Sequence, residues 1–502
     1  MIFGCCFLYY RYFLSIASLQ NEENLRMMNY LVKYKKKWNA MSPVAKSSMA
    51  MIFAKFFQKG LSMISGPVFT RIMSSSEYGI ISTFTSWQSV LYIIATLNMA
   101  SGVFNNGMID FKKDRESFTY SIMCLANLCT FLCMGVYFLF YRWLNPLFDM
   151  PVSLMAVMLL YFIFTPAYNY WMGKQRFEYR YKGITAVTIV TSLLSFVLSV
   201  VCVLMASDQY KAVTKVMAAE SVSIGIGVFF FISIIIKAKG KIKFAYWKYA
   251  LEFNLPLIPH YLSMYVLSSS DRIMISKLIN TSATAVYNVA YTVAGIMLIF
   301  WNAVDASYAP WIYQQMEREN YQSIKVRGNQ VLLFFSGLTI LCTLFAPEII
   351  CILAPESYHS GIYVIPSVAA GVFFTACYSL YMRLELYLKK TKTVMAATCS
   401  VAVLNLVLNY IFIPEFGFVA AGYTTLVCYG LLAFFHYCCV RHLGFSHVYD
   451  NKRILGLSCF VVLITVIISE IYSYMMIRYS LIAVLGLIMV IKRKEIVKML
   501  KK

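Results

Sequence analysis

Fourteen long apolar segments separated by short polar connections dominate this chain of 502 residues. A helix needs roughly 20 apolar residues to cross the hydrocarbon core of a membrane. Backbone N–H and C=O groups find no water there, so each such segment must satisfy them internally as a helix. We therefore predict an all-α integral membrane protein with fourteen spans. They are expected at 47–70, 79–105, 118–141, 152–171, 184–206, 214–236, 249–274, 284–310, 328–346, 361–384, 394–413, 418–440, 454–472 and 477–491.

Basic residues alternate along the connections between these segments. Connections on one side contain three to five Lys or Arg each, and those on the other side contain at most two. Short cytoplasmic loops are enriched in Lys and Arg, so the basic set and both termini are predicted to face the cytoplasm. The net charge of +22 then reflects orientation and attraction to anionic lipids, and no nucleic-acid partner is expected. The basic connections are 108–117, 172–183, 237–248, 311–327, 385–393 and 441–453.

Two halves of the chain repeat one order of parts. PVFTRIMSSSEYGIISTFTSW at 67–87 and SSSDRIMISKLINTSATAVYNVAYTV at 268–293 both place a basic residue and a Ser/Thr-rich turn before a Tyr that opens a long span. Both copies begin inside, which indicates parallel six-span repeats. We predict a basic N-terminal extension at 1–46, which a natural start at Met27, Met28 or Met41 would shorten. The other parts are an N-lobe at 47–236, a basic linker at 237–248, a C-lobe at 249–440, and spans 13–14 with a basic tail at 441–502.

Three stretches resemble a known family. They are TRIMSSSEYG at 70–79, NLPLIPHYLSMYVLSSSDRIMI at 254–275 continuing to VYNVAYTV at 286–293, and NLVLNYIFIPEFGFVAAGYTTL at 405–426. With the fourteen-span layout, they make residues 42–492 similar to the prokaryotic polysaccharide transporters. These are Wzx-like flippases for oligosaccharide repeat units, within the multidrug/oligosaccharidyl-lipid/polysaccharide (MOP) exporter superfamily.

The resemblance implies alternating access by two six-helix lobes in the bacterial inner membrane. The implied substrate is a polyprenyl-diphosphate-linked oligosaccharide, moved to the outer leaflet for O-antigen, capsule or exopolysaccharide synthesis. Its charged, hydroxyl-rich head group would lose its water partners in hydrocarbon, so unassisted crossing is negligible. Membrane lipids, a polysaccharide polymerase and glycosyltransferases are the expected partners. No cofactor is expected beyond coupling to a gradient of H+ or Na+.

Basic and imidazole groups inside the spans are the candidates for substrate binding. Lys55 and Lys59 lie four residues apart on one face of span 1, and helical rise places Lys59 about 18 Å from the cytoplasmic end. Lysine binds phosphate as a point charge, so Lys59 is a candidate diphosphate ligand. A structural ion pair or a misplaced span start are the alternatives for Lys59, and snorkelling explains Lys55 equally well.

Arg71 and Arg272 take corresponding places at the outer ends of spans 1 and 7. Both are candidate contacts for the diphosphate before release. For Arg272, an interfacial charge or a local ion pair with Asp271 is the competing interpretation. His260 lies in span 7 at the depth of Lys59 in span 1, either as a sugar-binding or proton-coupling group or as a neutral side chain packed between helices.

Carboxylates inside the spans are the candidates for binding a coupling ion, because coupling needs a site that binds the ion in one conformation only. Glu220 in span 6 is the first candidate, followed by Asp305 in span 8 and Glu252 in span 7. Asp305 is also compatible with a solvated role at the interface. Pro256 and Pro259 interrupt intrahelical hydrogen bonds in span 7 and predict a hinge.

Two asparagines complete the polar groups within the spans. Asn405 and Asn409 are spaced four residues apart in span 11, a pattern that more often joins helices than contacts substrate.

Two rival functions remain open. A cation-coupled multidrug exporter of the same superfamily would share the twelve-span core. A membrane polymerase or glycosyltransferase would need a long external loop with catalytic groups, and 347–360 offers only Glu348, Glu356 and His359. No P-loop, HExxH or GxSxG motif is present. We therefore expect a transporter with no catalytic residues and no metal site.

Overall fold

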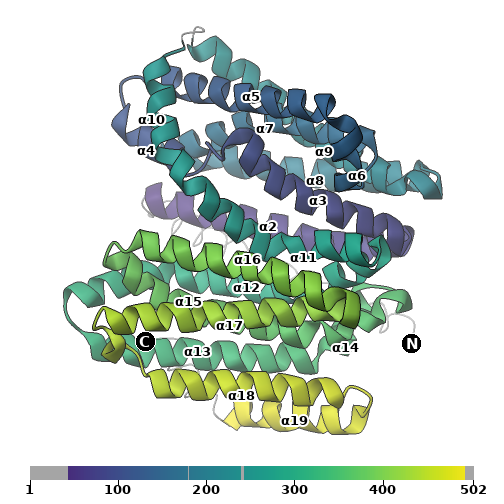
Figure 1. Cartoon of the computed structure of the whole chain (residues 1–502), viewed down its shortest axis with the longest axis vertical. Coiled ribbons are helices and arrows are strands. Elements are labelled where there is room, and N and C mark those ends of the chain that lie inside the picture. The colour runs from purple at the N-terminus through teal and green to yellow at the C-terminus, as the bar shows by residue number, and fades with distance from the viewer. Residues whose placement is uncertain (1–42, 179, 239–241, 492–502) are drawn as a thin grey trace, which may run out of the picture. The chain divides into compact units, whose positions relative to one another are not determined.

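The computed structural model describes residues 43–178, 180–238 and 242–491, and every regular element among them is a helix (Figure 1). The predicted all-α class is confirmed. Most of the predicted N-terminal extension, the last residues of the basic tail and three linker residues lie outside the described part. The helices of the first half are α2 (Pro43–Ile72), α3 (Ser75–Thr96), α4 (Gly102–Asp110), α5 (Arg115–Leu139), α6 (Tyr141–Phe148), α7 (Val152–Phe177), α8 (Tyr181–Met205), η1 (Asp208–Tyr210) and α9 (Lys211–Ala238).

The second half repeats this arrangement and then adds two helices. A short 3-10 turn, η2, interrupts its first membrane helix. The elements are α10 (Phe244–Asn254), η2 (Leu255–Leu257), α11 (Ile258–Leu278), α12 (Thr281–Glu317), α13 (Tyr321–Leu344), α14 (Ala346–Leu353), η3 (Glu356–Tyr363), α15 (Ile365–Tyr387), α16 (Thr391–Phe416), α17 (Phe418–His442), η4 (Ser446–Val448), α18 (Asn451–Glu470) and α19 (Met475–Ile491).

Ten helices in the described part are long and apolar enough to cross a membrane, so the count of fourteen spans stays a prediction. Helices α2, α3 and α11 have the length but a more polar composition, with 30, 22 and 21 residues respectively. A polar helix at membrane depth is stable only where its polar groups have partners within the protein. Two of these helices, α2 and α11, carry all five predicted substrate-binding side chains.

Two predicted spans are broken rather than continuous. The segment 79–105 ends as α3 at Thr96, where Leu97 and Asn98 have φ of 51° and 48°, and restarts as α4. A left-handed backbone at Leu97 is unfavourable for a branched side chain. The carbonyl of Leu97 accepts a hydrogen bond from the side chain of Asn254, which is fully buried at the end of α10. The second break, at η2, follows directly after Asn254.

The core of the second half is centred on α15, which packs against α12, α13, α17 and α18. In the apolar window of α15, 89% of the residues are buried, because small side chains such as Ala369 and Ala370 let neighbouring helices approach. Gly422 of α17 lies so close to Ser367 of α15 that a Cβ at residue 422 would collide with the Ser367 hydroxyl. Figure 1 shows α15 and α17 side by side.

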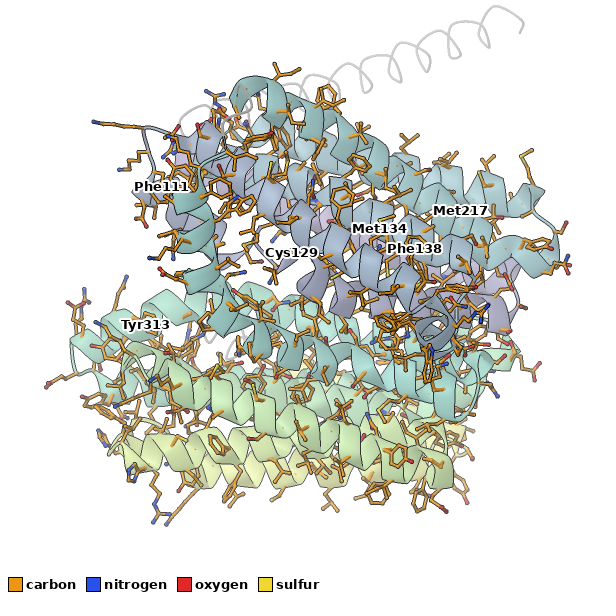
Figure 2. All side chains as sticks on the ribbon, turned by 45° about the horizontal axis from the view of Figure 1, so that its top comes forward. Phe111, Cys129, Met134, Phe138, Met217 and Tyr313 are labelled. Atoms are coloured by element: carbon orange, nitrogen blue, oxygen red, sulfur yellow. The ribbon has the colours of Figure 1, made fainter. Side chains whose placement is uncertain are left out.

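The first half has a separate core between α3, α5, α7 and α9. Its centre is aromatic and aliphatic, with Phe84 and Phe162 almost fully buried. On the outside, side chains such as Phe138 and Met217 are exposed and apolar (Figure 2), as contact with lipid tails requires. The protein is therefore a multi-pass membrane protein.

The chain divides into two compact units that do not coincide with the predicted lobes. One contains the residues up to Lys59 together with Met172–Val190, and the other contains Gly60–Trp171 together with Thr191–Lys502. Within the first unit, Thr185 donates a hydrogen bond to the carbonyl of Ala50 at 3.5 Å. All contacts described below lie within the second unit. The predicted domain boundaries stay predictions.

Candidate functional site

Asp271 on α11 is a fully buried carboxylate. Its Oδ2 accepts hydrogen bonds from the hydroxyl of Tyr287 at 2.6 Å and from that of Thr425 at 2.9 Å. Its Oδ1 accepts one from the side-chain amide of Asn409 at 2.7 Å. The three donors come from α12, α17 and α16, so four helices meet at this one carboxylate.

A second layer of amides and hydroxyls orients these donors. Asn409 also donates to Asn405 Oδ1 at 3.2 Å, and Thr424 donates to Asn409 Oδ1. Asn405 in turn donates to Thr425 at 3.4 Å and accepts from Ser270 at 3.2 Å. Both asparagines are fully buried. We name this cluster the Asp271 network; it comprises Ser270, Asp271, Tyr287, Asn405, Asn409, Thr424 and Thr425.

No basic side chain in the described part of the chain forms an ion pair with Asp271. A buried carboxylate without a compensating charge is strongly unfavourable. A proton or a small cation bound at Asp271 would remove this cost. Carboxylate, amide and hydroxyl oxygens are the ligands that hard cations prefer, and an amide flip exchanges its NH2 donor for an oxygen acceptor.

Arg272, the next residue, turns away from this network. Its Nε donates to Asn288 Oδ1 at 2.7 Å and its Nη1 donates to the carbonyl of Ser268 at 2.8 Å. Its guanidinium lies 4.3 Å from the ring centroid of Tyr291 on α12, a cation–π contact. The local ion pair with Asp271 that sequence suggested is not formed. Adjacent residues of α11 thus carry a buried anion and a half-buried cation.

Arg71 and His260 have hydrogen-bond partners other than those of Arg272. Arg71 donates to the carbonyls of Pro67 and Ile352, both at 2.9 Å. His260 is half-buried, with Nδ1 3.2 Å from the hydroxyl of Thr398. Lys55 and Lys59 are both exposed on α2 and belong to the other compact unit. Their assignment as substrate ligands stays a prediction.

The three predicted coupling carboxylates lie outside the Asp271 network. Glu220 accepts a hydrogen bond from Gln88 at 3.1 Å in the first half. Asp305 forms a two-pronged ion pair with Arg383, with Nε and Oδ1 3.1 Å apart. Glu252 is exposed and pairs with Lys248 on the same helix. Pro256 and Pro259 flank the start of α11 and are exposed.

The predicted outer ends of the two halves are in direct contact. Ser76 and Thr281 share a hydrogen bond of 2.9 Å where α3 meets α12, and Thr70 donates to the carbonyl of Leu353 at 3.1 Å. Lys277 of α11 pairs with Asp149 at 3.6 Å. We name these contacts, together with the Arg71–Ile352 bond, the outer seal.

Gly79 makes this closeness possible. A Cβ at this position would lie 2.5 Å from the carbonyl carbon of Thr281 and closer still to its oxygen. Only glycine lets the two backbones approach so far.

A second buried polar pair was not anticipated from sequence. His436 on α17 and Glu385 on α15 are both fully buried, with Nδ1 and Oε1 2.6 Å apart. The sequence pattern does not indicate that His436 and Glu385 meet, because they lie in separate apolar segments. The packing of α15 against α17 brings them together.

Two protein-family models match this chain. A family model described as "Polysaccharide biosynthesis protein" matches residues 44–307, and a second model, MatE, matches residues 256–411. Among curated protein sequences, none matches this chain.

Solved transporters share the fold. A structure of the lipid II flippase MurJ in an inward closed conformation has a TM-score of 0.63 at 14% identity, covering 88% of this chain and 99% of that one. An inward-facing multidrug resistance MATE transporter of the MOP superfamily has a TM-score of 0.56 at 13% identity, covering 80% and 95%. An outward-facing MATE structure has a TM-score of 0.53 at 13% identity, covering 84% and 98%.

The first family model spans more than half of the chain and the predicted resemblance is confirmed. Its relatives in fold are transporters rather than enzymes. The chain therefore belongs to the polysaccharide biosynthesis protein family, and it shares its fold with transporters of the MOP superfamily.

Proposed function

We propose that this transporter is a flippase that carries a polyprenyl-diphosphate-linked oligosaccharide from the inner to the outer leaflet of the bacterial cytoplasmic membrane. The product would supply O-antigen, capsule or exopolysaccharide synthesis. Family membership and the fold shared with a lipid II flippase support a lipid-linked substrate. The outer seal closes one end of the contact between the two halves, as one state of an alternating-access cycle requires.

The observation that carries the proposal is the pair of opposite charges at Asp271 and Arg272. Successive residues on a helix point about 100° apart, so one turn of α11 presents an anion to the C-terminal core and a cation elsewhere. Asp271 is the proposed coupling site, binding H+ or Na+. Arg272 is the proposed contact for the substrate diphosphate, because guanidinium binds phosphate through two parallel hydrogen bonds.

The two sites share their supporting helices. Tyr287, which donates to Asp271, and Asn288, which accepts from Arg272, are neighbours on α12. An ion that neutralises Asp271 weakens the hydrogen bond from Tyr287 to its carboxylate. Any resulting shift of α12 also moves Asn288, the partner of Arg272. An ion can shift a conformational equilibrium only through such a differential interaction.

Proteoliposomes test this proposal directly. A fluorescent polyprenyl-diphosphate oligosaccharide is placed in one leaflet, and its appearance in the other is followed under a gradient of Na+ or of H+. Wild-type protein should respond to one of the two gradients. Asp271→Asn keeps the shape of the side chain but removes its charge, so the response should disappear.

Asp208→Asn is the matched control, because the Asp208 side chain is 96% exposed. A full gradient response in Asp271→Asn would exclude Asp271 as the coupling site. A wild-type protein that moves no lipid-linked sugar would exclude the flippase.

A second candidate function is a cation-coupled multidrug exporter. The MatE model covers residues 256–411, which include Asp271, Asn405 and Asn409, and two MATE structures share the fold. The same proteoliposomes distinguish the two functions when a cationic dye replaces the lipid. Dye transport without lipid transport would favour the exporter.

The orientation of the chain and the role of α2 are parts of the same proposal. Both termini are proposed to lie in the cytoplasm. Glycosyltransferases and a polymerase are the proposed partners. Lys59, with Lys55 nearby on the same helix, remains the proposed first contact for the diphosphate. Replacing Lys59 with Ala at matched protein level should lower surface polysaccharide, and unchanged export would remove it as a ligand.

A further inference from the structure

Glu385 on α15 and His436 on α17 form a buried pair of titratable groups in the second half. Both side chains are fully buried, and Oε1 of Glu385 lies 2.6 Å from Nδ1 of His436. Their remaining polar atoms, Oε2 of Glu385 and Nε2 of His436, have no hydrogen-bond partner among the described residues. Neither group belongs to the Asp271 network.

The neighbours of the pair on its own two helices carry no fixed charge. On α15, the ring of Tyr378 stacks on the imidazole of His436, with centroids 6.0 Å apart. On α17, the thiol of Cys439 interacts electrostatically with Glu385. Neither the phenol nor the thiol supplies a positive charge that could balance a carboxylate.

The helices packed around the pair supply no balancing charge either. Asp305 of α12 is already paired with Arg383 of α15. The other elements packed on α15 and α17 are α11, α13, α16, α18, η3 and η4. In the part of the chain that the structure describes, none of them forms an ion pair or a hydrogen bond with the side chain of Glu385 or His436.

The number of protons on the pair decides its net charge. With one proton to share, the pair is neutral as a whole, either as carboxylic acid and imidazole or as carboxylate and imidazolium. With none, a carboxylate is buried beside a neutral imidazole. Burying an unbalanced carboxylate costs far more free energy than leaving a neutral N–H or C=O without a partner. The buried pair therefore retains one proton.

The same two groups hold fewer protons in water. At pH 7 a free glutamate is ionised, and a free imidazole is only about one-quarter protonated. Burial of the pair between α15 and α17 therefore binds most of one proton from the solvent at neutral pH.

The pair and the Asp271 network lie toward opposite predicted faces of the membrane. Glu385 is two residues from the end of α15, and His436 is six residues from the end of α17, both predicted cytoplasmic ends. A rise of about 1.5 Å per residue places them about 3 Å and 9 Å from those ends. Asp271 instead lies in the last third of α11, toward its predicted outer end.

We propose that Glu385 and His436 form a proton-binding site of the second half, separate from the Asp271 network. Its ligand is a single proton, taken from cytoplasmic water and shared by the two side chains while they are buried. A transporter that binds Na+ at Asp271 would still respond to cytoplasmic pH through this pair. The inference rests on the packing of α15 and α17, and not on the identity of the transported substrate.

The number of protons released on unfolding tests the site. The purified protein is unfolded in detergent at pH 7 in weak buffer, and a pH indicator counts the protons. Glu385→Gln imitates the protonated carboxyl, because its amide can donate to Nδ1 of His436. Wild type should therefore release about one proton more per molecule than Glu385→Gln. Equal release by the two proteins would overturn the proposal.

Glu415→Gln is the matched control for the charge change. Glu415 is exposed at the end of α16, so it is ionised at pH 7 in both the folded and the unfolded protein. Its replacement should leave the proton release at the wild-type value.

Imidazole NMR of the wild-type protein is a second measurement, which decides the matter if Glu385→Gln does not fold. The chain has five histidines, so labelling with a nitrogen isotope and single replacement of the other four identify the signals of His436. A stored proton leaves a hydrogen on Nε2 of His436 at pH 7. A bare Nε2, with Nδ1–H donated to the carboxylate, would overturn the site.

Independence from the Asp271 network is tested with the same count. Asp271→Asn and the double variant Asp271→Asn with Glu385→Gln should again differ by about one proton. Loss of this difference would overturn the separation of the two sites. Failure of Asp271 as the coupling site leaves these proton counts unchanged, so the two proposals can be refuted separately.

Discussion

Replacing Gly79 with Ala should open the outer seal without touching either proposed binding site. A Cβ at residue 79 would lie 2.5 Å from the carbonyl carbon of Thr281 and 3.1 Å from its Cα, whereas ordinary contacts begin at 3.4 Å. The obstacle is backbone, so no side-chain rotation relieves it. Helices α3 and α12 must therefore separate by about 1 Å at this point.

The size of the effect follows from two terms. Forcing an extra methyl into a packed contact costs about 1–3 kcal/mol. Separation also breaks the Ser76–Thr281 hydrogen bond, a net loss of about 0.5–1.5 kcal/mol. A state in which α3 and α12 are already apart carries neither cost. The two costs together, about 2–4 kcal/mol, therefore shift the equilibrium between the closed and open outer seal roughly 30- to 1,000-fold toward the open form.

The assay uses a carbodiimide, which joins a carboxylate and an amine in contact into an amide, and measures the Asp149–Lys277 product by mass spectrometry in detergent micelles. Lys248 and Glu252, 3.8 Å apart within α10, provide the internal standard. Gly66→Ala is the matched control, because a Cβ there meets nothing within 4 Å. The control should retain the wild-type yield, and Gly79→Ala should lose most of it. A folded Gly79→Ala protein with an unchanged cross-link would refute the argument that these backbones must part.

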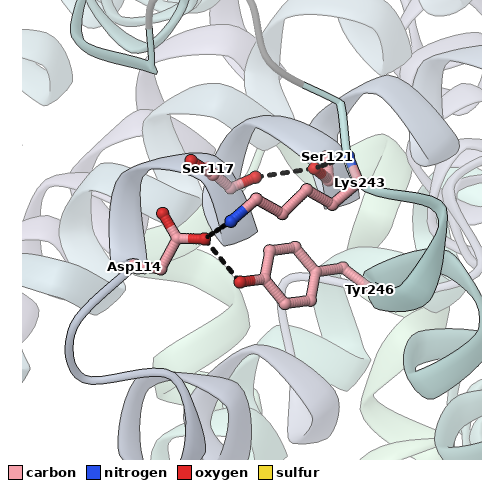
Figure 3. Close-up of polar contacts among 5 residues, drawn as sticks. All are labelled: Asp114, Ser117, Ser121, Lys243 and Tyr246. Carbon is pink, nitrogen blue, oxygen red and sulfur yellow. Dashed lines mark hydrogen bonds and ion pairs between the residues drawn. The ribbon is translucent and has the colours of Figure 1, made fainter.

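Three further predictions concern separate sites. Asn409→Asp places a second carboxylate against Asp271, so the two should share a proton or bind a cation more tightly. Protection from thermal unfolding by the bound ion should therefore increase. No change in the ion dependence of the melting temperature would count against the network as an ion site. Arg478 is 2% exposed and its Nη1 lies 2.5 Å from Glu348, whose side chain is 29% exposed. Glu348→Gln leaves the buried guanidinium without its counter-charge, so it should destabilise the protein by about 2–3 kcal/mol in detergent-induced unfolding, more than Arg478→Met, which removes the buried charge; equal effects would contradict a buried pair. Burial raises the pKa of Asp114, but hydrogen bonds from Lys243 and Tyr246 (Figure 3) outweigh it and lower the pKa to about 2. The stability that these contacts of Asp114 contribute is therefore complete above pH 3.8 and is lost as the pH falls through about 2. The melting-temperature difference between wild type and Asp114→Asn should persist at pH 5 and vanish only below pH 2, and a difference already lost at pH 5 would contradict the lowered pKa.

Periodicity and length were enough to predict the helical class, because a membrane leaves the chain no alternative to helices at these lengths. The prolines of span 7 also indicated a weak point, and the structure has the turn η2 there. The sequence did not reveal that this span breaks into α10 and α11. At the break, Asn254 donates a hydrogen bond to the carbonyl of Leu97, 157 residues away, and no local pattern reports such a contact.

The Asp271 network was missed for a related reason. Asp271 looked like an interfacial charge because it lies near the end of an apolar segment beside Arg272. Its donors come from positions 16, 138 and 154 residues further along the chain. The four-residue spacing of Asn405 and Asn409 did indicate a polar contact between helices, and that pattern was the one signal that pointed toward the site.

The wide spacing of the network has a consequence for biosynthesis. When α11 enters the membrane, Asp271 has no donor but those of the surrounding water and translocation machinery, and Thr425 emerges only 154 residues later. A carboxylate in hydrocarbon without partners is expelled or protonated, so α11 cannot settle at its final depth until α17 has been inserted. This site is therefore completed late in translation, and a nascent chain that stops before α17 lacks the Thr425 donor to Asp271.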